Sequence, residues 1–384
     1  MKIVMLSTSA SHHPGPRARW LPLAYVAQQH GVTTEMLCTH PDYVNLITPH
    51  QSIEGVAVTH VAQMHVNRHG QPLTGWELIA TALRTSLRMA LHTIRAKPQV
   101  IGICKAQPIN GLAAVLAHRR TGAQIILDVD DCEHESHQFG RAWHKALVAR
   151  VEHILPTIAQ STSVATQWQL TQLAQAGHHN LAHIPNGISH IPVLPEQVAS
   201  LPDHYIAYVG RIAFNTHAVD VLIEAIAQTH TTMPLVIVGS GPDVVALHHR
   251  ISQHGVAARC IWLGQVPPTV AQAIIAHAHA TIDPVRDTPA AAARYPLKII
   301  ESLAHGVPVI TSPVGDRATM IGPHGRLVAA GSARALAHAI DAICGQPRLS
   351  RAAGKAQVAH LTWDQVGTRW LTHHRLIPTL RGSS

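Results

Sequence analysis

The sequence predicts an α/β fold made of two Rossmann-like domains, and three observations support this prediction. The chain has 384 residues, of which 46% are hydrophobic, so it is too long for one ordinary core and suits two domains of about 150 to 200 residues. In both halves, short β-branched runs alternate with longer amphipathic runs, which is typical of βαβ units and parallel sheets. Between the halves, Pro192, Pro195 and Pro202 interrupt a stretch without hydrophobic periodicity, which indicates a linker.

The expected elements follow from this pattern. We predict an N-terminal domain over residues 1–190, a linker over 191–204, a second domain over 205–362 and a C-terminal helix over 363–384. The strands of the first domain are predicted at 2–7, 33–37, 100–104, 124–129, 163–166 and 182–184. Those of the second domain are predicted at 205–209, 235–238, 260–263, 280–283, 308–311 and 326–328.

One amphipathic run in the first domain leaves two interpretations open. Residues 74–95 carry apolar side chains at Leu78, Leu83, Leu87, Met89 and Leu91, among three arginines. This spacing predicts a helix. The helix either packs on the core with a solvated basic face or lies with its basic flank on anionic lipid.

Composition limits the partners and the compartment. The net charge is +8 and the pI is about 9.6, which favours anionic partners, although a basic surface without a partner is an equal alternative. No run of 18 apolar residues occurs, and the N-terminus predicts a strand and not a signal peptide, so we expect a cytoplasmic protein. Five scattered cysteines without a C-x-x-C pair predict neither a disulfide framework nor a zinc knuckle.

The most informative segment is residues 294–316, where a short helix precedes a buried strand. Pro296 can open the helix and Gly306 can close it. We expect Leu297, Ile300 and Leu303 on an inward face, and Lys298, Glu301 and His305 on a face free for a ligand. The strand ends at the edge where open α/β sheets bind ligands, so a carboxylate at position 301 can hold ribose hydroxyls.

Other strand ends in the second half carry residues suited to phosphate. Arg211 follows the first strand, and its rigid bidentate fork suits a diphosphate, although a surface cap is the alternative. Gly239 and Gly241 follow the next strand, where glycine lets the backbone approach a ligand or turn tightly. Gly315 and Asp316 precede a helix start, whose backbone N–H groups can bind phosphate.

Two strand ends in the first half carry further candidates. The loop after the first strand reads HHPGPR and contains Gly15 and Arg17, which either touch a phosphate or a second substrate or are solvated. Asp130 and Asp131 follow the fourth strand. They either bind that substrate or cap a helix.

Residues 294–316 resemble the donor-binding segment of the retaining glycosyltransferases of family four, the glycosyl transferases group 1. The order of the other motifs agrees, from the Val-Gly-Arg at 209–211 to the Val-Gly-Ser-Gly-Pro at 238–242. This resemblance implies the GT-B fold, in which two Rossmann-like domains face each other across a cleft and the C-terminal helix crosses back to the N-terminal, acceptor-side domain. It also implies a nucleotide-sugar donor and no metal site.

The resemblance assigns roles to single residues. It implies that Glu301 holds the ribose, that Arg211 neutralises the leaving diphosphate, and that Gly264 and Val266 frame the nucleobase, with Gly210 beside the donor. Two positions depart from the family. Ala293 stands where the family has a first glutamate, and His217 falls where it has a lysine, so Lys298 is expected to supply the second cation.

The sequence therefore predicts a retaining, hexosyltransferase-like enzyme that uses a UDP- or GDP-sugar, with a glycan or glycolipid acceptor, as in polysaccharide biosynthesis. Arg211, Lys298 and Glu301 are its candidate catalytic residues. Peripheral attachment to the inner face of the membrane is compatible with this function. Two alternatives remain: a degenerate protein that binds nucleotide or sugar without turnover, and a nucleotide-sugar epimerase or hydrolase. With two Phe and five Tyr, the chain lacks the aromatic residues of a nucleic-acid binder.

Overall fold

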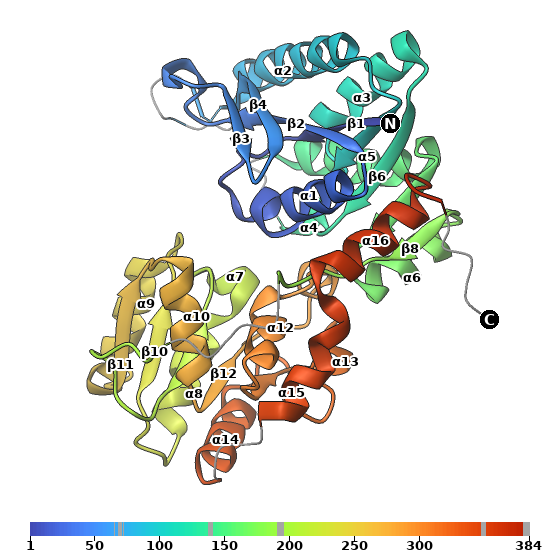
Figure 1. Ribbon diagram of the computed structural model, residues 1–384. Helices are drawn as coiled ribbons and strands as arrows, with labels where there is room; N and C mark the ends of the chain where they lie inside the picture. Colours follow the sequence, from blue (N-terminus) through green and yellow to red (C-terminus); the bar gives the residue numbers. More distant parts are fainter. Residues whose placement is uncertain are drawn as a thin grey trace, which may run out of the picture. The chain divides into compact units, whose positions relative to one another are not determined.

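The protein divides into two compact units. The structure, a computed structural model, describes residues 1–64, 66–67, 71, 73–136, 141–189, 196–346 and 351–378. Unit 1 comprises Met1–Ser189 and Trp363–Ser384, and unit 2 comprises His190–Thr362. Residues 191–195 of the predicted linker and 379–384 of the predicted C-terminal helix lie outside the described residues. Each unit has one sheet with helices on its faces (Figure 1), and these two sheets of mostly parallel strands confirm the predicted fold class.

Unit 1 contains an eight-stranded sheet in the order β3-β4-β2-β1-β5-β6-β7-β8. Its strands are β1 (Lys2–Ser7), β2 (Thr33–His40), β3 (His50–Ile53), β4 (Val56–Gln63), β5 (Val100–Cys104), β6 (Gln124–Val129), β7 (Ser161–Val164) and β8 (Leu181–His183). All neighbours are parallel except β3 and β4. The sequence analysis found six of these strands and missed the β3–β4 hairpin at the edge.

Side-chain alternation along the strands divides the core of unit 1 into two layers. Ile3 and Met5 of β1 pack with α1 (Leu21–Gln29) and α16 (Trp363–His373), whereas Val4 and Leu6 pack with helices on the opposite face. α16 lies beside α1 (Figure 1), and Gly367 allows this approach, because a Cβ there would lie 2.7 Å from Val26 Cβ. The C-terminal segment thus completes the core of unit 1.

The opposite face of the sheet carries α2 (Gly75–Ala96) and α3 (Pro108–Thr121). α3 begins with Pro108 and ends at Gly122 with φ +70°, the left-handed cap that glycine adopts readily. The remaining helices of the unit are α4 (Glu133–Ser136), α5 (Ala142–Ile158) and α6 (Gln167–Gln175). A π-helical turn at Pro16–Trp20 and a 3-10 turn at Tyr43–Asn45 complete it.

α2 packs against the core and has a solvated basic face, but the residues that it buries are not the expected leucines. Its buried residues are mostly small or polar: Thr85, Ser86, Met89, Ala90 and Thr93. Three of its four leucines are exposed: Leu83, Leu87 and Leu91 are 50%, 54% and 51% exposed. Small side chains let α2 approach α3 closely, so the leucine stripe is left outside the core.

Unit 2 contains a six-stranded, all-parallel sheet in the order β11-β10-β9-β12-β13-β14. Its strands are β9 (Ile206–Val209), β10 (Leu235–Val238), β11 (Cys260–Gly264), β12 (Ala280–Ile282), β13 (Val309–Thr311) and β14 (Gly325–Leu327). Its helices are α7 (Phe214–His217), α8 (Val219–Gln228), α9 (Val244–Gln253), α10 (Pro268–His277), α11 (Pro289–Ala293), α12 (Leu297–Ala304), α13 (Arg317–Ile321), α14 (Ala333–Cys344) and α15 (Arg351–Val358).

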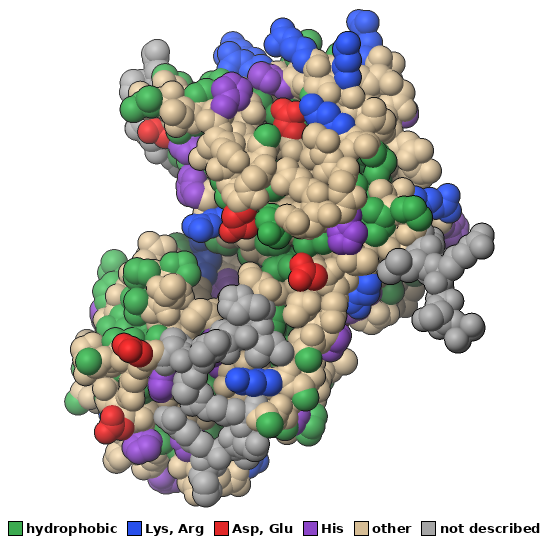
Figure 2. All heavy atoms as spheres, viewed as in Figure 1, with side chains coloured by type: hydrophobic (Ala, Val, Ile, Leu, Met, Phe, Trp, Pro, Cys, Tyr) green, Lys and Arg blue, Asp and Glu red, His purple; other side chains and the backbone are tan. Residues whose placement is uncertain are grey.

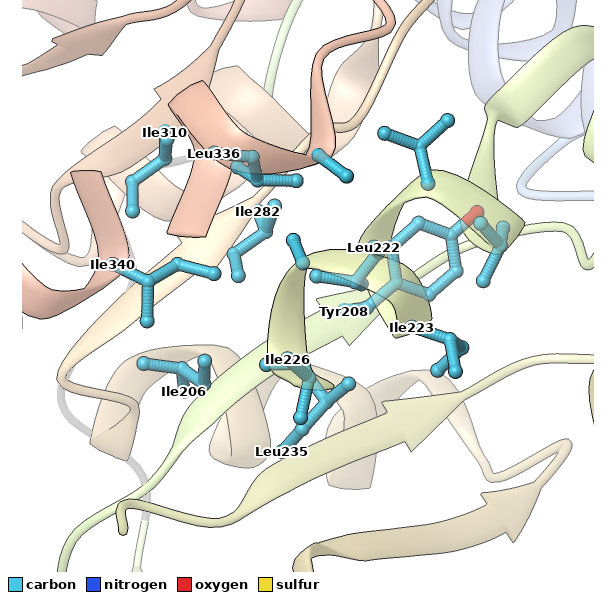
Figure 3. Close-up of a cluster of buried hydrophobic side chains, with 14 of the residues drawn as sticks. Ile206, Tyr208, Leu222, Ile223, Ile226, Leu235, Ile282, Ile310, Leu336 and Ile340 are labelled. Carbon is cyan, nitrogen blue, oxygen red and sulfur yellow. The ribbon is translucent and has the colours of Figure 1, made fainter. Parts of the chain in front are cut away.

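The largest core of unit 2 lies between its sheet and the helices α8 and α14. Figure 3 shows Leu222 and Ile226 of α8 and Ile340 of α14 turned toward Ile206 and Ile282 of the sheet. These five side chains are fully buried. The core fixes the strands whose ends carry the candidate residues.

The strand order of each sheet indicates the edge at which a ligand is expected to bind. In unit 2 the chain builds β9, β10 and β11 outward in one direction and then returns to pair β12 with β9 on the other side. In unit 1 the same reversal occurs between β1 and β5. In open α/β sheets, ligands bind outside the carboxyl ends of the strands at this switch point. No helix in the described ranges is both long enough and apolar enough to cross a bilayer.

Candidate functional site

The switch point of unit 2 holds a cluster of buried charges. Lys298 of α12 places its Nζ atom 3.3 Å from Asp283 Oδ1 and 4.3 Å from the centroid of the Tyr208 ring. Gly210, at the end of β9, makes room for this ammonium group, because a Cβ there would lie 2.9 Å from it. The candidates Gly210 and Lys298, 88 residues apart in the printed sequence, therefore meet at one point.

Asp283 is the anion at the centre of this cluster, and the sequence analysis noted it only as the end of a strand. Arg317 donates from Nε to Asp283 Oδ2 at 2.8 Å, and Thr311 donates its hydroxyl to the same carboxylate. Burial opposes ionisation, but Arg317 and Lys298 outweigh it and hold the pKa of Asp283 well below its usual range. Burial also lowers the pKa of Lys298, against the pull of Asp283. An Asp at the end of β12 beside the switch point was the signal that could have identified it.

His217, at the end of α7, is a neutral imidazole. Burial, followed by the charges of Lys298 and Arg294, lowers the pKa of His217 to about 2, although Asp283 acts in the opposite direction. Thr216 Oγ1 lies 2.9 Å from its Nδ1 atom. The position at which the sequence analysis expected a weakened cation therefore carries no charge at neutral pH.

Arg211 differs from the buried cations because its side chain is exposed. Tyr208 donates its hydroxyl to the carbonyl oxygen of Arg211 at 2.7 Å, which fixes the backbone at the end of β9. Within the described part of the chain, the guanidinium group has no ion-pair partner. Its charge also reaches His217, because it contributes to the lowered pKa of that group.

Glu301 lies on α12, one turn from Lys298, and is partly buried. Burial raises the pKa of Glu301, and a hydrogen bond from the Gln272 side chain opposes this shift. Gln272 Oε1 also lies 2.8 Å from His305 Nε2. Gln272 of α10, which the sequence analysis missed, therefore orients the carboxylate. A polar residue on a neighbouring helix gives no sequence signal for such a contact.

The expected division of α12 into two faces is only partly right. Ile300 and Leu303 are fully buried, as expected, but Leu297 is only partly buried. His305 is not free for a ligand, since it is 1% exposed and bonded to Gln272. Pro296 is the N-cap residue, so the helix begins at Leu297, and Gly306 follows its end with φ +70°.

The candidate glycines after β9 and β10 let two loops pack against each other. Gly239 has φ +136°, and a Cβ there would lie 1.8 Å from Gly210 O. A Cβ at Gly241 would lie 2.1 Å from Ile212 O. Ile212 N donates to Ser240 O at 3.0 Å across the same contact. These glycines therefore build the rim of the site, and their contact with a ligand stays a prediction.

Gly264, Val266, Gly315 and Asp316 continue this rim. Gly264 accepts a hydrogen bond of 2.7 Å from Gly239 N, and Val266 is partly buried in the loop after β11. Gly315 has φ +59° and lies against Ala292 O, where a Cβ would approach to 2.3 Å. Asp316 is the N-cap residue of α13. The adjacent Ala293, which stands where the resemblance implies a glutamate, is fully buried in α11.

In unit 1 the candidates divide into buried and exposed groups. Gly15 packs against the Trp20 ring, and Arg17 is exposed. Asp131 accepts hydrogen bonds from Cys132 N at 2.9 Å and from the Ser136 hydroxyl, but from no described backbone N–H group of α4, so neither alternative is decided for it. Asp130 lies 3.4 Å from Lys105 Nζ. Burial, with Glu133 and Asp131 nearby, raises the pKa of Asp130 to about 6 against the pull of Lys105.

A neighbouring aspartate, Asp128, has a structural role that the sequence analysis missed. Arg19 donates to both of its oxygens, at 2.6 and 2.8 Å, and Trp20 Nε1 donates to Oδ2 at 2.8 Å. Despite burial, these partners lower the pKa of Asp128. The pair ties the turn that follows the loop of Gly15 to the end of β6.

One group of possible metal ligands occurs among the described residues: Cys132, His134 and Glu152. Glu152 accepts hydrogen bonds from the backbone N–H groups of Glu133 and His134, at 2.7 and 3.2 Å, and from the His134 ring. These bonds give the carboxylate a capping role at the start of α4. The expectation that the protein needs no metal stays a prediction.

Comparison with known proteins identifies the family of the second unit. Residues 203–346 match the family model described as glycosyl transferases group 1. No curated protein sequence matches the chain.

Solved structures are similar over nearly the whole chain. Sucrose-phosphate synthase from Thermosynechococcus elongatus is 18% identical, with 98% of each chain covered and a TM-score of 0.80. HepE of Anabaena, solved in complex with UDP, is 15% identical over 98% of this chain and 100% of that chain, with a TM-score of 0.73. The pneumococcal O-GlcNAc transferase GtfA, in complex with UDP and GlcNAc, is 13% identical over 98% and 99%, with a TM-score of 0.67. These similarities show the fold. Residues 203–346 thus match glycosyl transferases group 1, and the chain has the fold of the GT-B glycosyltransferases.

Proposed function

We propose that this protein is a glycosyltransferase, which binds a nucleoside diphosphate sugar in unit 2 and transfers the sugar, with retention of configuration, to a glycan or lipid-linked acceptor. One observation carries the proposal: the field at the switch point of unit 2 is positive. Lys298 and Arg317 share the single carboxylate of Asp283, at 3.3 and 2.8 Å, which leaves one positive charge in excess, and the exposed guanidinium group of Arg211 stands just after β9. Such a site favours an anion.

This field suits the departure of a diphosphate. Negative charge grows on the leaving group as its bond to the sugar breaks, and preorganised cations stabilise that charge. The exposed Arg211 can form a bidentate contact with phosphate oxygens. Lys298 is held in place by Asp283 and the Tyr208 ring, so its ammonium group needs little reorganisation.

Glu301 is proposed to hold the ribose hydroxyls of the nucleotide. Its carboxylate is oriented by Gln272 and stands on the same helix as Lys298. Structures of similar fold were solved with UDP or UDP-glucose, in HepE, and with UDP and GlcNAc, in GtfA. We therefore propose a UDP-sugar as the first donor to test, with GDP-sugars second.

Retention is proposed to follow from attack of the acceptor on the face that the diphosphate leaves. Asp283, the carboxylate closest to Lys298, is buried and paired with Arg317, so it is unsuited to act as a nucleophile. Ala293 offers no carboxylate either. With no such group assigned to a covalent intermediate, the leaving diphosphate itself is the base that accepts the proton of the attacking hydroxyl. No step assigned here needs a metal, so we expect transfer to persist in EDTA.

The test is thermal stabilisation of the purified protein by UDP-, GDP- and ADP-sugars, with ATP and NAD as controls. A ligand at 100 times its Kd adds about 2.7 kcal/mol of stability. One nucleotide-sugar class should stabilise the wild type and the control Glu224→Ala, whose carboxylate is exposed on α8, but not Glu301→Ala. Stabilisation by none of them would reject the donor site.

Turnover is then measured as release of nucleoside diphosphate in the presence of acceptors. Binding without release under any acceptor would favour the degenerate protein that binds without turnover. Release of free sugar without an acceptor would favour a hydrolase. A retained anomeric configuration in the product, read by NMR, tests the stereochemical part of the proposal.

A further inference from the structure

Unit 1 contains a large apolar groove that the donor site does not use. Its volume is about 1050 Å³, and α2, α3 and α5 supply most of its walls. The apolar side chains include Leu78 and Leu83 of α2, Leu112 and Val115 of α3, and Leu147 and Val151 of α5. Several of them are open to solvent, since Leu112, Leu147 and Leu83 are 39%, 43% and 50% exposed. Apolar walls of this extent suit a hydrocarbon chain.

One end of the groove is polar and lies at the switch point of unit 1. Thr8 follows β1, and Lys105 and Gln107 follow β5, so all three stand at the edge where open α/β sheets bind ligands. Lys105 Nζ lies 2.7 Å from Glu133 Oε1, and Gln107 donates to the other oxygen of Glu133. Amine, amide, hydroxyl and carboxylate groups together can bind the hydroxyl groups of a sugar.

The charges at this end argue against a bare phosphate. Lys105 faces both Asp130 and Glu133, at 3.4 and 2.7 Å, so its single positive charge is already offset. The groove therefore combines an apolar body with a neutral or acidic polar end. This is the chemistry of an amphiphile whose head carries hydroxyl groups.

The helices that flank the groove carry the features of a membrane surface. On α2, the exposed Leu83, Leu87 and Leu91 alternate with the exposed Arg84 and Arg88. Trp76, at the start of the helix, is 83% exposed. Figure 2 shows Lys and Arg side chains gathered along the edge of unit 1 where Figure 1 has α2. Apolar and basic side chains on one exposed face suit the surface of an anionic bilayer.

α5 repeats this combination on the other side of the groove. Trp143 and Leu147 are 41% and 43% exposed, and Arg150 on the same helix and Arg141 at its N-cap are exposed, together with Lys145, which pairs with Glu135 at 2.9 Å. Among the described residues of α5, only Glu152 is acidic. The charge complementarity therefore points to an anionic membrane on both sides of the groove.

We propose that the groove of unit 1 binds the hydrocarbon chain of a lipid-linked acceptor in an anionic membrane, with its sugar hydroxyls at Lys105, Gln107 and Glu133. The inference rests on the proposed function, because the lipid is the acceptor of the transferred sugar. The exposed face of α2 lies on the bilayer surface, which brings the groove to the lipid.

The groove is tested with alkyl maltosides below their critical micelle concentrations, titrated calorimetrically into the full-length protein. Each methylene buried in an apolar groove should raise the affinity roughly fourfold, so octyl, decyl and dodecyl maltoside should form a steep series and maltose should bind weakly. Leu147→Glu puts a charge on the groove wall and should weaken dodecyl maltoside at least tenfold. Ile47→Glu, which changes an apolar residue of unit 1 that is 95% exposed and does not line the groove, should not.

Three outcomes would contradict the proposal that the groove binds a hydrocarbon chain. They are an affinity independent of chain length, maltose binding as tightly as dodecyl maltoside, and equal effects of Leu147→Glu and Ile47→Glu. If Leu147→Glu fails to fold, Ala82→Phe fills the groove without a charge and should weaken the same ligand. Thermal stabilisation by the nucleotide-sugar is measured on every variant. Retained donor binding with no alkyl maltoside binding rejects this inference alone, whereas loss of both in the wild type rejects the proposed function as well.

The membrane is tested by co-sedimentation with phosphatidylcholine vesicles, with and without phosphatidylglycerol. The wild type should sediment only with the anionic vesicles, and Arg84→Glu with Arg88→Glu should reduce binding at least tenfold. The pair Arg334→Glu with Lys355→Glu changes the net charge equally on unit 2 and should leave sedimentation intact. An equal loss of vesicle binding in the two double variants, or sedimentation of the wild type with vesicles that lack phosphatidylglycerol, would contradict the proposal that α2 lies on an anionic membrane.

Discussion

The two switch points share one topology but have opposite electrostatics. Each places a lysine beside an aspartate at the carboxyl edge of its sheet: Lys105 beside the partly buried Asp130 in unit 1, and Lys298 beside the buried Asp283 in unit 2. Acidic neighbours and burial raise the pKa of Asp130 to about 6, whereas Arg317 and Lys298 lower that of Asp283 despite its burial. The lysines shift in the opposite sense, with the pKa of Lys105 raised by its carboxylates and that of Lys298 lowered chiefly by burial.

This contrast shows that the neighbours, and not the Lys–Asp pair itself, decide what each edge can bind. Unit 2 surrounds its pair with cations and so favours an anion such as a diphosphate. Unit 1 surrounds its pair with carboxylates and hydroxyls and so suits an uncharged hydroxyl group. The fold supplies the same edge twice, and a few side chains give the two edges opposite electrostatics, as the proposed donor and acceptor sites require.

The largest expected effect comes from removing the anion of unit 2. Asp283→Asn leaves Arg317 and Lys298 buried without their counter-charge, so we expect the free energy of unfolding to fall by about 3–5 kcal/mol. Urea denaturation followed by circular dichroism measures the change. Asp287→Asn, in the loop after β12, is a control that should change stability by less than about 0.5 kcal/mol. A loss below about 1 kcal/mol for Asp283→Asn would contradict the cluster.

Lys298 gives the next largest effect, on transfer and not on stability. Lys298→Met removes a preorganised cation from the departing diphosphate, so kcat should fall about 10² to 10³-fold. The rate is followed as nucleoside diphosphate released with the donor and acceptor found in the binding screens. Lys355→Met, elsewhere in unit 2, should transfer sugar at the wild-type rate. An equal fall of kcat in Lys298→Met and Lys355→Met would show that Lys298 contributes only to the net charge of the protein.

Replacing Asp130 of unit 1 should raise the free energy of unfolding, whereas replacing Asp283 of unit 2 should lower it. A folded pKa of about 6, above the ordinary value of 3.8, means that the folded state binds the proton more tightly, so this group lowers stability as pH rises from about 4 to 6. Asp130→Asn should therefore stabilise the protein by about 1–3 kcal/mol at pH 7, and the gain should vanish below about pH 4. Paired denaturation curves from pH 4 to pH 8 check this. A destabilised variant at pH 7 would mean that the ion pair with Lys105 outweighs burial.

The fold was largely predictable because its strands are buried and regular. β1, β5, β6 and β10 have the predicted bounds, since short β-branched runs in parallel sheets have sharp ends. The hairpin β3–β4 was missed, because β3 is an exposed four-residue edge strand, HQSI, without hydrophobic alternation. The face of α2 was also unpredictable, since a leucine stripe usually marks the buried side and here the small residues face α3.

The candidate site was predictable as a set of positions but not as a set of contacts. A strand end located Arg211, and the three-residue spacing on one helix face located Lys298 and Glu301. Their partners Asp283, Arg317 and Gln272 come from other strands and helices, and pairing at such sequence separations depends on packing. The unequal electrostatics of the two edges likewise arise only when these distant residues meet.

The smallest expected effect on the transfer rate is that of replacing His217, and it tests whether this residue contributes positive charge to the site of unit 2. Because burial and the surrounding cations lower its pKa to about 2, the imidazole is neutral throughout the working range and acts only through its hydrogen bond to Thr216. His217→Gln keeps a neutral polar side chain, so the transfer rate should stay within about threefold, with the same pH profile from pH 5 to pH 8. If His217 were instead the second cation, the wild-type rate would fall above about pH 6.5, and the variant would lose both the rate and that limb.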